Sequence, residues 1–242
     1  MKMSRGIDVD GEAGQPTDRK SALAGALRHR IISMELRPGA VVDELELADE
    51  FSLSRPPVRE LMRQMAAEGY IELEANRPAR VSSLNYQSLR SFFLAAPLIY
   101  IVTTQLAAAN STPDDIDRLK RIQQNLQIAV SENDVDGRVR YNDQFHLEIG
   151  RMAQNDYLMP SLRRLLIDHA RLGKIFYRHP GVERMQQDMA DAVDQHEQII
   201  KAIALHDAVR AGDLIRAHWE LSRLRMAEYA VPEGVHVPIG VA

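Results

Sequence analysis

The stretch from residue 85 to residue 229 limits the fold most, because it contains no strand pattern. Apolar residues recur there at helical spacing, and turn-forming residues divide the stretch into segments. One start is marked clearly by Thr112-Pro113-Asp114-Asp115, which offers an N-cap, an early proline and acidic first-turn residues. Helices are expected at residues 85–109, 113–131, 135–153, 157–178, 182–205 and 208–229. We therefore predict a mainly α protein in which residues 85–229 form an antiparallel all-helical bundle.

The first 83 residues show three short helical segments followed by two strand-like pieces. The helices are expected at Ser21–Met34, Glu44–Phe51 and Arg55–Glu68, and the strands at Tyr70–Leu73 and Arg80–Ser82. Ser54 is a natural N-cap for the third helix, and Gly69 is its natural end. This order describes a winged helix-turn-helix. We place that domain at residues 20–83 and the helical domain at 85–229, with a flexible tail at 1–19 and a loose tail at 230–242.

Composition restricts the function only weakly. The chain has no cysteine, which excludes disulfides and thiolate chemistry and fits a reducing compartment. We find no apolar run that approaches the roughly 18 residues of a membrane span, and no signal peptide. We therefore expect a cytoplasmic protein without membrane contact. The net charge is −4, so DNA binding must depend on where the arginines lie and not on their total.

The third helix of the N-terminal domain carries a row of arginines. Arg55 and Arg59 are four residues apart and share a helical face, and Arg63 continues the row. Val58 and Leu61 lie towards the other side, where they can pack on the first two helices. A helix with an apolar back and an arginine edge suits the major groove, where arginine binds guanine or a phosphate. The alternative is that the row is an ordinary solvated face.

The same region resembles the DNA-binding head of GntR-family regulators. The matching motifs are Pro38-Gly39, Leu47-Ala48, Ser54-Arg55, Pro57-Val58-Arg59-Glu60 and Glu68-Gly69-Tyr70. The resemblance implies that Arg55 and Arg59 contact operator DNA and that the wing tip enters the minor groove. The sequence departs from the family pattern at Pro56, where threonine is usual, and at Asn76 and Pro78 in the wing tip. The candidate DNA-contacting residues are Ser54, Arg55, Arg59, Arg63, Arg77 and Arg80.

Four residues of the helical domain form a candidate metal site. His196 precedes Asp207 by 11 residues and His218 follows it by 11, so a tight hairpin at Asp207 brings the two histidines level. Asn142 and His146 are four apart and share a helical face. Imidazole and amide oxygen ligands suit zinc, nickel, manganese or iron. The alternative is that the three histidines are ordinary surface or core residues. That is what we expect of the other histidines, His29, His169, His179, His206 and His236.

Residues 85–229 resemble the FCD sensor domain of FadR-type GntR regulators. The shared motifs are Asn142-Asp143-Gln144-Phe145-His146, Ala153-Gln154-Asn155, His196-Glu197-Gln198-Ile199 with Ala202-Ile203, and Asp207 with Ala211 and His218. The resemblance implies a divalent metal bound by Asn142, His146, His196 and His218, with a small carboxylate effector beside it. Asp143 points about 100° away from Asn142 and ranks below it as a ligand. An arginine usual on the first sensor helix is missing, and Arg171, Lys174 or Arg178 are possible substitutes.

The resemblance favours a homodimeric, ligand-responsive regulator of transcription, expected to be a repressor, that binds double-stranded operator DNA. Two alternatives stay open at this point. One is a metal-dependent enzyme in the helical domain, with Glu197 or Asp143 as the base. The other is a regulator for which the metal itself is the signal.

Overall fold

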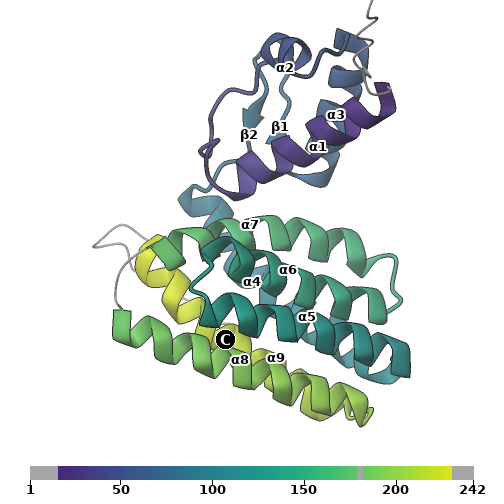
Figure 1. Ribbon diagram of the computed structural model, residues 1–242, viewed down its shortest axis with the longest axis vertical. Coiled ribbons are helices and arrows are strands. Elements are labelled where there is room, and N and C mark those ends of the chain that lie inside the picture. The colour runs from purple at the N-terminus through teal and green to yellow at the C-terminus, as the bar shows by residue number, and fades with distance from the viewer. Residues whose placement is uncertain (1–15, 179–181, 231–242) are drawn as a thin grey trace, which may run out of the picture.

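The computed structural model describes residues 16–178 and 182–230, which form a small N-terminal head above a larger helical bundle (Figure 1). The head contains α1 (Pro16–Ile32), α2 (Glu44–Glu50), α3 (Arg55–Glu68), β1 (Ile71–Glu72) and β2 (Arg80–Val81). The bundle contains α4 (Tyr86–Asn110), α5 (Pro113–Ser131), α6 (Val135–Met152), α7 (Leu158–Arg178), α8 (Val182–Ala204) and α9 (Ala208–Ala230). This is the predicted winged helix-turn-helix followed by an all-helical domain.

The head folds around one apolar core that all of its elements share. Leu23 and Leu27 of α1 and Val58 and Met65 of α3 are fully buried in it. Strands β1 and β2 pair antiparallel. Val81 also exchanges backbone hydrogen bonds with the segment around Gly39, so this loop extends the small sheet.

Helix α1 begins at Pro16, five residues before the predicted start. Proline suits the first turn of a helix, and Asp18 adds a favourable acidic residue there. The early turns are held by polar contacts: Arg19 donates to the Ser52 carbonyl, and Lys20 pairs with Glu60. These residues carry no apolar periodicity, so residues 16–19 were wrongly placed in the tail. Residues 1–15 and 231–242 lie outside the described part of the chain.

The Ser54 side chain does not cap α3, contrary to the sequence prediction. Ser54 occupies the N-cap position, but its side chain makes no capping hydrogen bond. An N-cap oxygen accepts from the backbone N–H of the second or third helical residue. Here these residues are Pro56 and Pro57, and proline has no N–H. The prolines therefore also remove two of the amides that a helix start normally offers to a phosphate.

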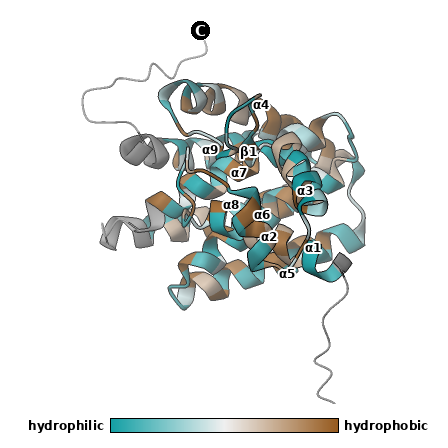
Figure 2. Ribbon diagram, turned by 90° about the horizontal axis from the view of Figure 1, so that it is seen from above, coloured by the Kyte–Doolittle hydropathy of each residue, from teal (hydrophilic) through white to brown (hydrophobic). Residues whose placement is uncertain are grey.

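Helix α4 lies at the centre of the bundle and packs against α6, α7, α8 and α9. Its length and composition would allow it to cross a membrane, which corrects our expectation that no apolar run reaches that size. Its apolar residues are used inside the protein, since Phe92, Phe93, Ala96, Tyr100 and Ala107 are buried in the bundle core. Along the other helices hydrophobic and hydrophilic residues alternate, as expected where one side is buried (Figure 2).

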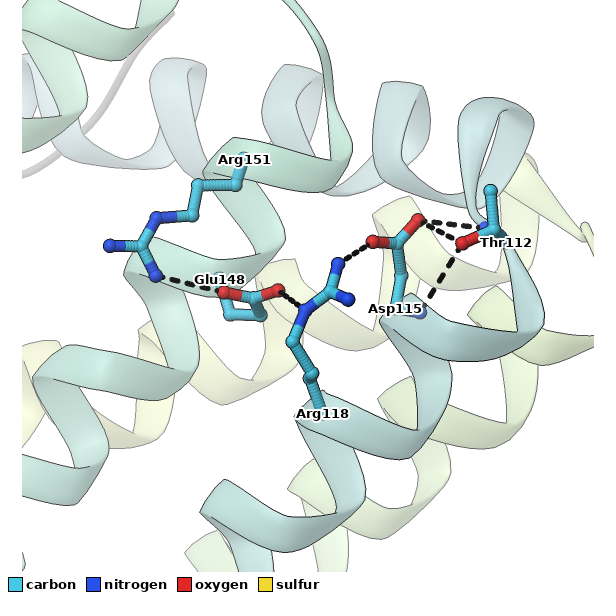
Figure 3. Close-up of polar contacts among 5 residues, drawn as sticks. All are labelled: Thr112, Asp115, Arg118, Glu148 and Arg151. Carbon is cyan, nitrogen blue, oxygen red and sulfur yellow. Dashed lines mark hydrogen bonds and ion pairs between the residues drawn. The ribbon is translucent and has the colours of Figure 1, made fainter.

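A polar network fastens α5 to α6 (Figure 3). The capping box predicted at the start of α5 is present, with Thr112 and Asp115 bonding reciprocally. Asp115 also contacts Arg118, and Arg118 donates to Glu148 of α6 at 2.9 Å. Arg151 donates to the second oxygen of Glu148 at 3.0 Å. A buried carboxylate is thus neutralised by two half-exposed arginines.

Candidate DNA-binding surface and metal centre

The arginine row of α3 lies at the surface of the head, next to Glu44 of α2. Arg55 donates from Nε to Glu44 at 2.8 Å, and Arg59 donates from Nε and Nη2 at 3.0 and 2.9 Å. The hydrogen bonds to both arginines lower the pKa of Glu44, that to Arg59 most. The side chains of Arg55 and Arg59 are nevertheless 58% and 49% exposed. Exposed pairs of this kind contribute little to stability, so DNA phosphates or bases can replace Glu44.

The other candidate DNA contacts are spread over the head. Arg63 is exposed one turn beyond Arg59 on α3. Arg77 lies at the wing tip and pairs with Glu74. Arg80 donates to the Gly39 carbonyl at 2.8 Å, so its guanidinium braces the wing against the neighbouring loop. Among these candidate residues, only Arg55 and Arg59 share a partner, which is Glu44.

Three of the four predicted metal ligands meet in the bundle core. His146 comes from α6, His196 from α8 and His218 from α9, and one ring nitrogen of each lies within 4.8 Å of the others. All three histidines are buried. Burial lowers the pKa of His146 and His196 well below the usual value and that of His218 to about 3. The rings are therefore neutral near pH 7, as metal ligands must be.

Gln123 fixes which nitrogen of His196 faces the cluster. Its Nε2 donates to the Val193 carbonyl at 3.0 Å, so its Oε1 faces His196 Nδ1, also at 3.0 Å. An amide oxygen only accepts, so His196 Nδ1 carries the proton and Nε2 presents a lone pair. His218 Nδ1 lies 3.0 Å from Gln195 Oε1, which orients that ring in the same way.

The geometry of the cluster fits a small divalent metal ion. His196 Nε2 and His218 Nε2 lie 3.2 Å apart, and His146 Nε2 is buried without a hydrogen-bond partner. Two nitrogens bound at about 2.0–2.1 Å to one tetrahedral ion are about 3.3–3.4 Å apart. An ion between the rings would use all three lone pairs and remove their mutual repulsion.

Asn142 and Asp143 lie on different sides of α6. Asn142 is partly buried one turn before His146, on the same helical face. Asp143 instead lines a cleft between the head and the bundle, where burial raises its pKa to about 7. Asn142 as the fourth ligand stays a prediction.

His169 of α7, expected to be an ordinary surface or core histidine, is a buried core residue that also borders the cluster. Its ring centroid lies 5.4 Å from that of His146, and its Nδ1 is 2.7 Å from the Tyr100 hydroxyl. The available signal was its spacing, since it continues the buried stripe of Leu162, Leu165 and Leu166 on α7.

The remaining residues singled out in the sequence lie away from the cluster or outside the described part. Arg171 pairs with Asp168 and Lys174 pairs with Asp136, so their charges are used elsewhere. His29 is exposed beside Glu35, and His206 bonds the Ala108 carbonyl. The described part does not include His179, His236 or the Arg178 side chain.

Comparison with known families decides the class of protein. Residues 19–81 match the family described as bacterial regulatory proteins, gntR family. Residues 101–221, half of the chain, match the FCD domain. The chain belongs to the GntR family. Its pairing of this head with an FCD domain confirms the FadR-type resemblance, so it is a DNA-binding regulator of transcription and not an enzyme.

Individual relatives of this GntR regulator are distant. The gluconate operon transcriptional repressor of Bacillus licheniformis is 26% identical over 188 residues, which cover 76% of this chain and 75% of that protein. The Nta operon transcriptional regulator of Aminobacter aminovorans is 24% identical over 136 residues, covering 55% of this chain and 63% of that protein. The solved structure of E. coli McbR/YncC shares the fold, with a TM-score of 0.72 and 18% identity over 87% of this chain and 96% of that chain.

Proposed function

We propose that this GntR regulator is a homodimeric repressor whose sensor domain holds a divalent metal ion and a small carboxylate effector. The ligands are His146, His196 and His218, with the side-chain oxygen of Asn142. The observation that carries the metal proposal is the 3.2 Å approach of the Nε2 atoms of His196 and His218. Three nitrogens and one amide oxygen suit zinc, nickel, manganese or iron.

The charge of this ligand set favours an anionic effector. Three neutral imidazoles and one amide leave both positive charges of the ion uncompensated in a buried site. An unpaired charge in a low-dielectric interior is costly, and a carboxylate bound to the ion would offset it. The relative from Bacillus licheniformis is named for a gluconate operon, and gluconate is itself a hydroxy carboxylate.

Operator recognition is assigned to the head. Arg55 and Arg59 enter the major groove with the start of α3, and Arg63 and the Ser54 hydroxyl lie close enough along the chain to reach the adjacent backbone. Arg77 at the wing tip is placed for the minor groove, and Arg80 supports the wing. Two heads in a homodimer would read the half-sites of a palindrome. We expect the protein to act in the cytoplasm, where its DNA target lies.

One experiment tests the sensor proposal directly. Purified full-length protein is stripped with a chelator, reloaded with Zn²⁺, Ni²⁺ or Mn²⁺, and analysed for bound metal. DNA binding is then measured with fragments from the protein's own promoter region, with and without a panel of small carboxylates. We expect one ion per chain and release of DNA by a carboxylate only when metal is bound. Failure of every metal to bind stoichiometrically would contradict the proposal, and control of DNA binding by metal alone would make the metal itself the signal.

A further inference from the structure

Helix α7 reaches both the histidine cluster and the head, and Arg171 makes its contact with the wing. The Arg171 side chain is 0% exposed. Its Nη1 donates to the Ser82 hydroxyl at 3.0 Å, and its Nη2 donates to the Ser82 carbonyl at 2.7 Å. Ser82 follows β2 directly, and its backbone N–H donates to the Tyr70 carbonyl at 3.0 Å. The Arg171 guanidinium therefore holds Ser82, the last residue of the wing with a backbone hydrogen bond to its neighbouring segment.

Asp168 connects this contact to a second one at the end of α3. Its Oδ1 accepts from Arg171 at 3.0 Å, and its Oδ2 accepts from Arg164 at 2.9 Å. The Arg164 side chain lies across Gly69, the left-handed residue that ends α3. A Cβ at position 69 would clash with the Arg164 side chain, so the two segments are in close contact. The buried carboxylate of Asp168 thus positions both arginines through which α7 contacts α3 and the wing.

Helix α1 also packs against α7, and a cleft occupies another part of the boundary between head and bundle. A cleft of about 980 Å³ lies between α1 and α3 of the head and α6 and α7 of the bundle. Where a cleft replaces packed side chains, the few direct contacts set the orientation of the parts they join. The contacts of Arg171 and Arg164, together with the packing of α1 on α7, are therefore expected to set the orientation of the head on the bundle.

The opposite side of α7 touches the histidine cluster. His169 follows Asp168 directly in the chain, and its Nδ1 is 2.7 Å from the Tyr100 hydroxyl. The Tyr100 and His146 rings pack with centroids 4.9 Å apart. A ligand that draws His146 towards the other two histidines would change the packing of Tyr100 and His169. The position of α7 would then change as well.

We propose that Arg171, held by Asp168, transmits the occupancy of the histidine cluster through α7 to the wing. Arg171 is a positioning residue, since it contacts neither the DNA nor the sensor ligand. The proposal rests on the proposed metal centre and goes beyond it by naming the joint between sensing and DNA binding. Loss of the joint leaves both functions in place and removes the connection between them.

The test compares the wild-type full-length chain with the double variant Asp168→Asn/Arg171→Met. This variant removes both charges, so neither is left buried and unpaired. Zn²⁺ is the probe, and amide hydrogen exchange of residues 69–82 is measured with and without it, together with Zn²⁺ stoichiometry and operator affinity. In the wild type, Zn²⁺ should alter exchange in this segment. In the variant this response should be lost, while Zn²⁺ stoichiometry, operator affinity and the exchange response around His146 persist.

Two further proteins complete the test. Ser82→Ala removes one of the two hydrogen bonds from Arg171 to Ser82 and leaves the buried ion pair with Asp168 intact, so it should reduce the wing response even if the double variant folds poorly. Arg121→Met, an exposed arginine of α5, should respond as the wild type does. Two outcomes would refute the joint alone. One is stoichiometric Zn²⁺ binding by the wild type with no change of exchange in residues 69–82. The other is a wild-type response in both Asp168→Asn/Arg171→Met and Ser82→Ala. Failure of the wild type to bind Zn²⁺ would refute the metal centre and the joint together.

Discussion

His196 Nε2 and His218 Nε2 face each other at 3.2 Å in the core of the sensor domain. Gln123 holds the proton of His196 on the far side of its ring, so the lone pair points at the neighbouring histidine. Without an ion or a proton between them, two such lone pairs repel. This pair is therefore the most direct place to test the sensor.

Replacing His196 by alanine should abolish stoichiometric metal binding. The variant loses one of three nitrogen ligands and leaves the other two too few to hold the ion. Elemental analysis of dialysed protein measures the loss, and thermal unfolding should show that metal no longer raises the midpoint. His29→Ala, at an exposed site of the head, is the control. Metal retained at one ion per chain in His196→Ala would count against the site.

Gln123→Ala should weaken metal binding without removing a ligand. His196 Nδ1 would lose the acceptor that fixes its tautomer and ring orientation, and such outer partners are typically worth about 10–100-fold in metal affinity. Competition with a metal-binding dye measures the change. Gln127→Ala is a matched control, because Gln127 lies one turn further along α5 and bonds the exposed Glu197. Equal affinities for the two variants would contradict the role given to Gln123.

Arg59→Ala should weaken operator binding by about 1–3 kcal/mol, the range for a good arginine contact to a base. The fold should be unaffected, because Arg59 is half exposed and its partner Glu44 lies at the surface. Fluorescence anisotropy with labelled operator DNA measures the affinity. Arg121→Ala, on the sensor domain, should bind as the wild type does, and a similar affinity for Arg59→Ala would remove Arg59 from the interface.

Operator binding should fall steeply with salt, since each neutralised phosphate contributes about 0.9 to the slope of log K against log salt concentration. The two prolines at the start of α3 remove backbone amides, so arginines must carry the phosphate contacts. Binding measured across a salt series gives the slope for the wild type and for Arg63→Ala. Wild-type operator affinity that does not change with salt would contradict DNA binding by this head.

Glu148→Ala should destabilise the sensor domain by about 1.5–3 kcal/mol, the range for hydrogen bonds to a charged group. The carboxylate is 3% exposed and joins Arg118 of α5 to Arg151 of α6. Urea unfolding measures the effect, with Asp117→Ala at an exposed position of α5 as the control. Indistinguishable midpoints for the two variants would show that the network of Figure 3 adds no stability.

Most of the fold could be predicted because local signals agree with the tertiary structure. The Thr112 capping box and the turn residues between segments fix helix ends to within a residue or two. The start of α1 was missed because its first turns are polar and held by contacts with Ser52 and Glu60, which only the fold brings near. The Ser54 cap was predicted wrongly although the sequence showed the reason, since prolines follow at the positions that must donate.

The candidate site could be predicted only in part, because its members differ in how local their signals are. His196 and His218 follow from a symmetric hairpin, and Asn142 and His146 from helical spacing. His169 has no motif of its own, and only its place on the buried stripe of α7 indicates that it points inward. Arg171 was considered as an effector partner, yet it serves Ser82, 89 positions away in the chain. No local sequence pattern predicts a contact between residues so far apart in the chain.

The single tryptophan of the chain, Trp219, sits next to His218 in the sequence and packs against Tyr100 and His169, with ring centroids 5.6 and 6.2 Å away. Its indole N–H is buried without a hydrogen-bond partner. Tryptophan emission thus originates beside the candidate sensor site and from nowhere else in the chain. Libraries of metals and organic acids can accordingly be screened on the unlabelled protein by its intrinsic fluorescence, before any operator sequence is known.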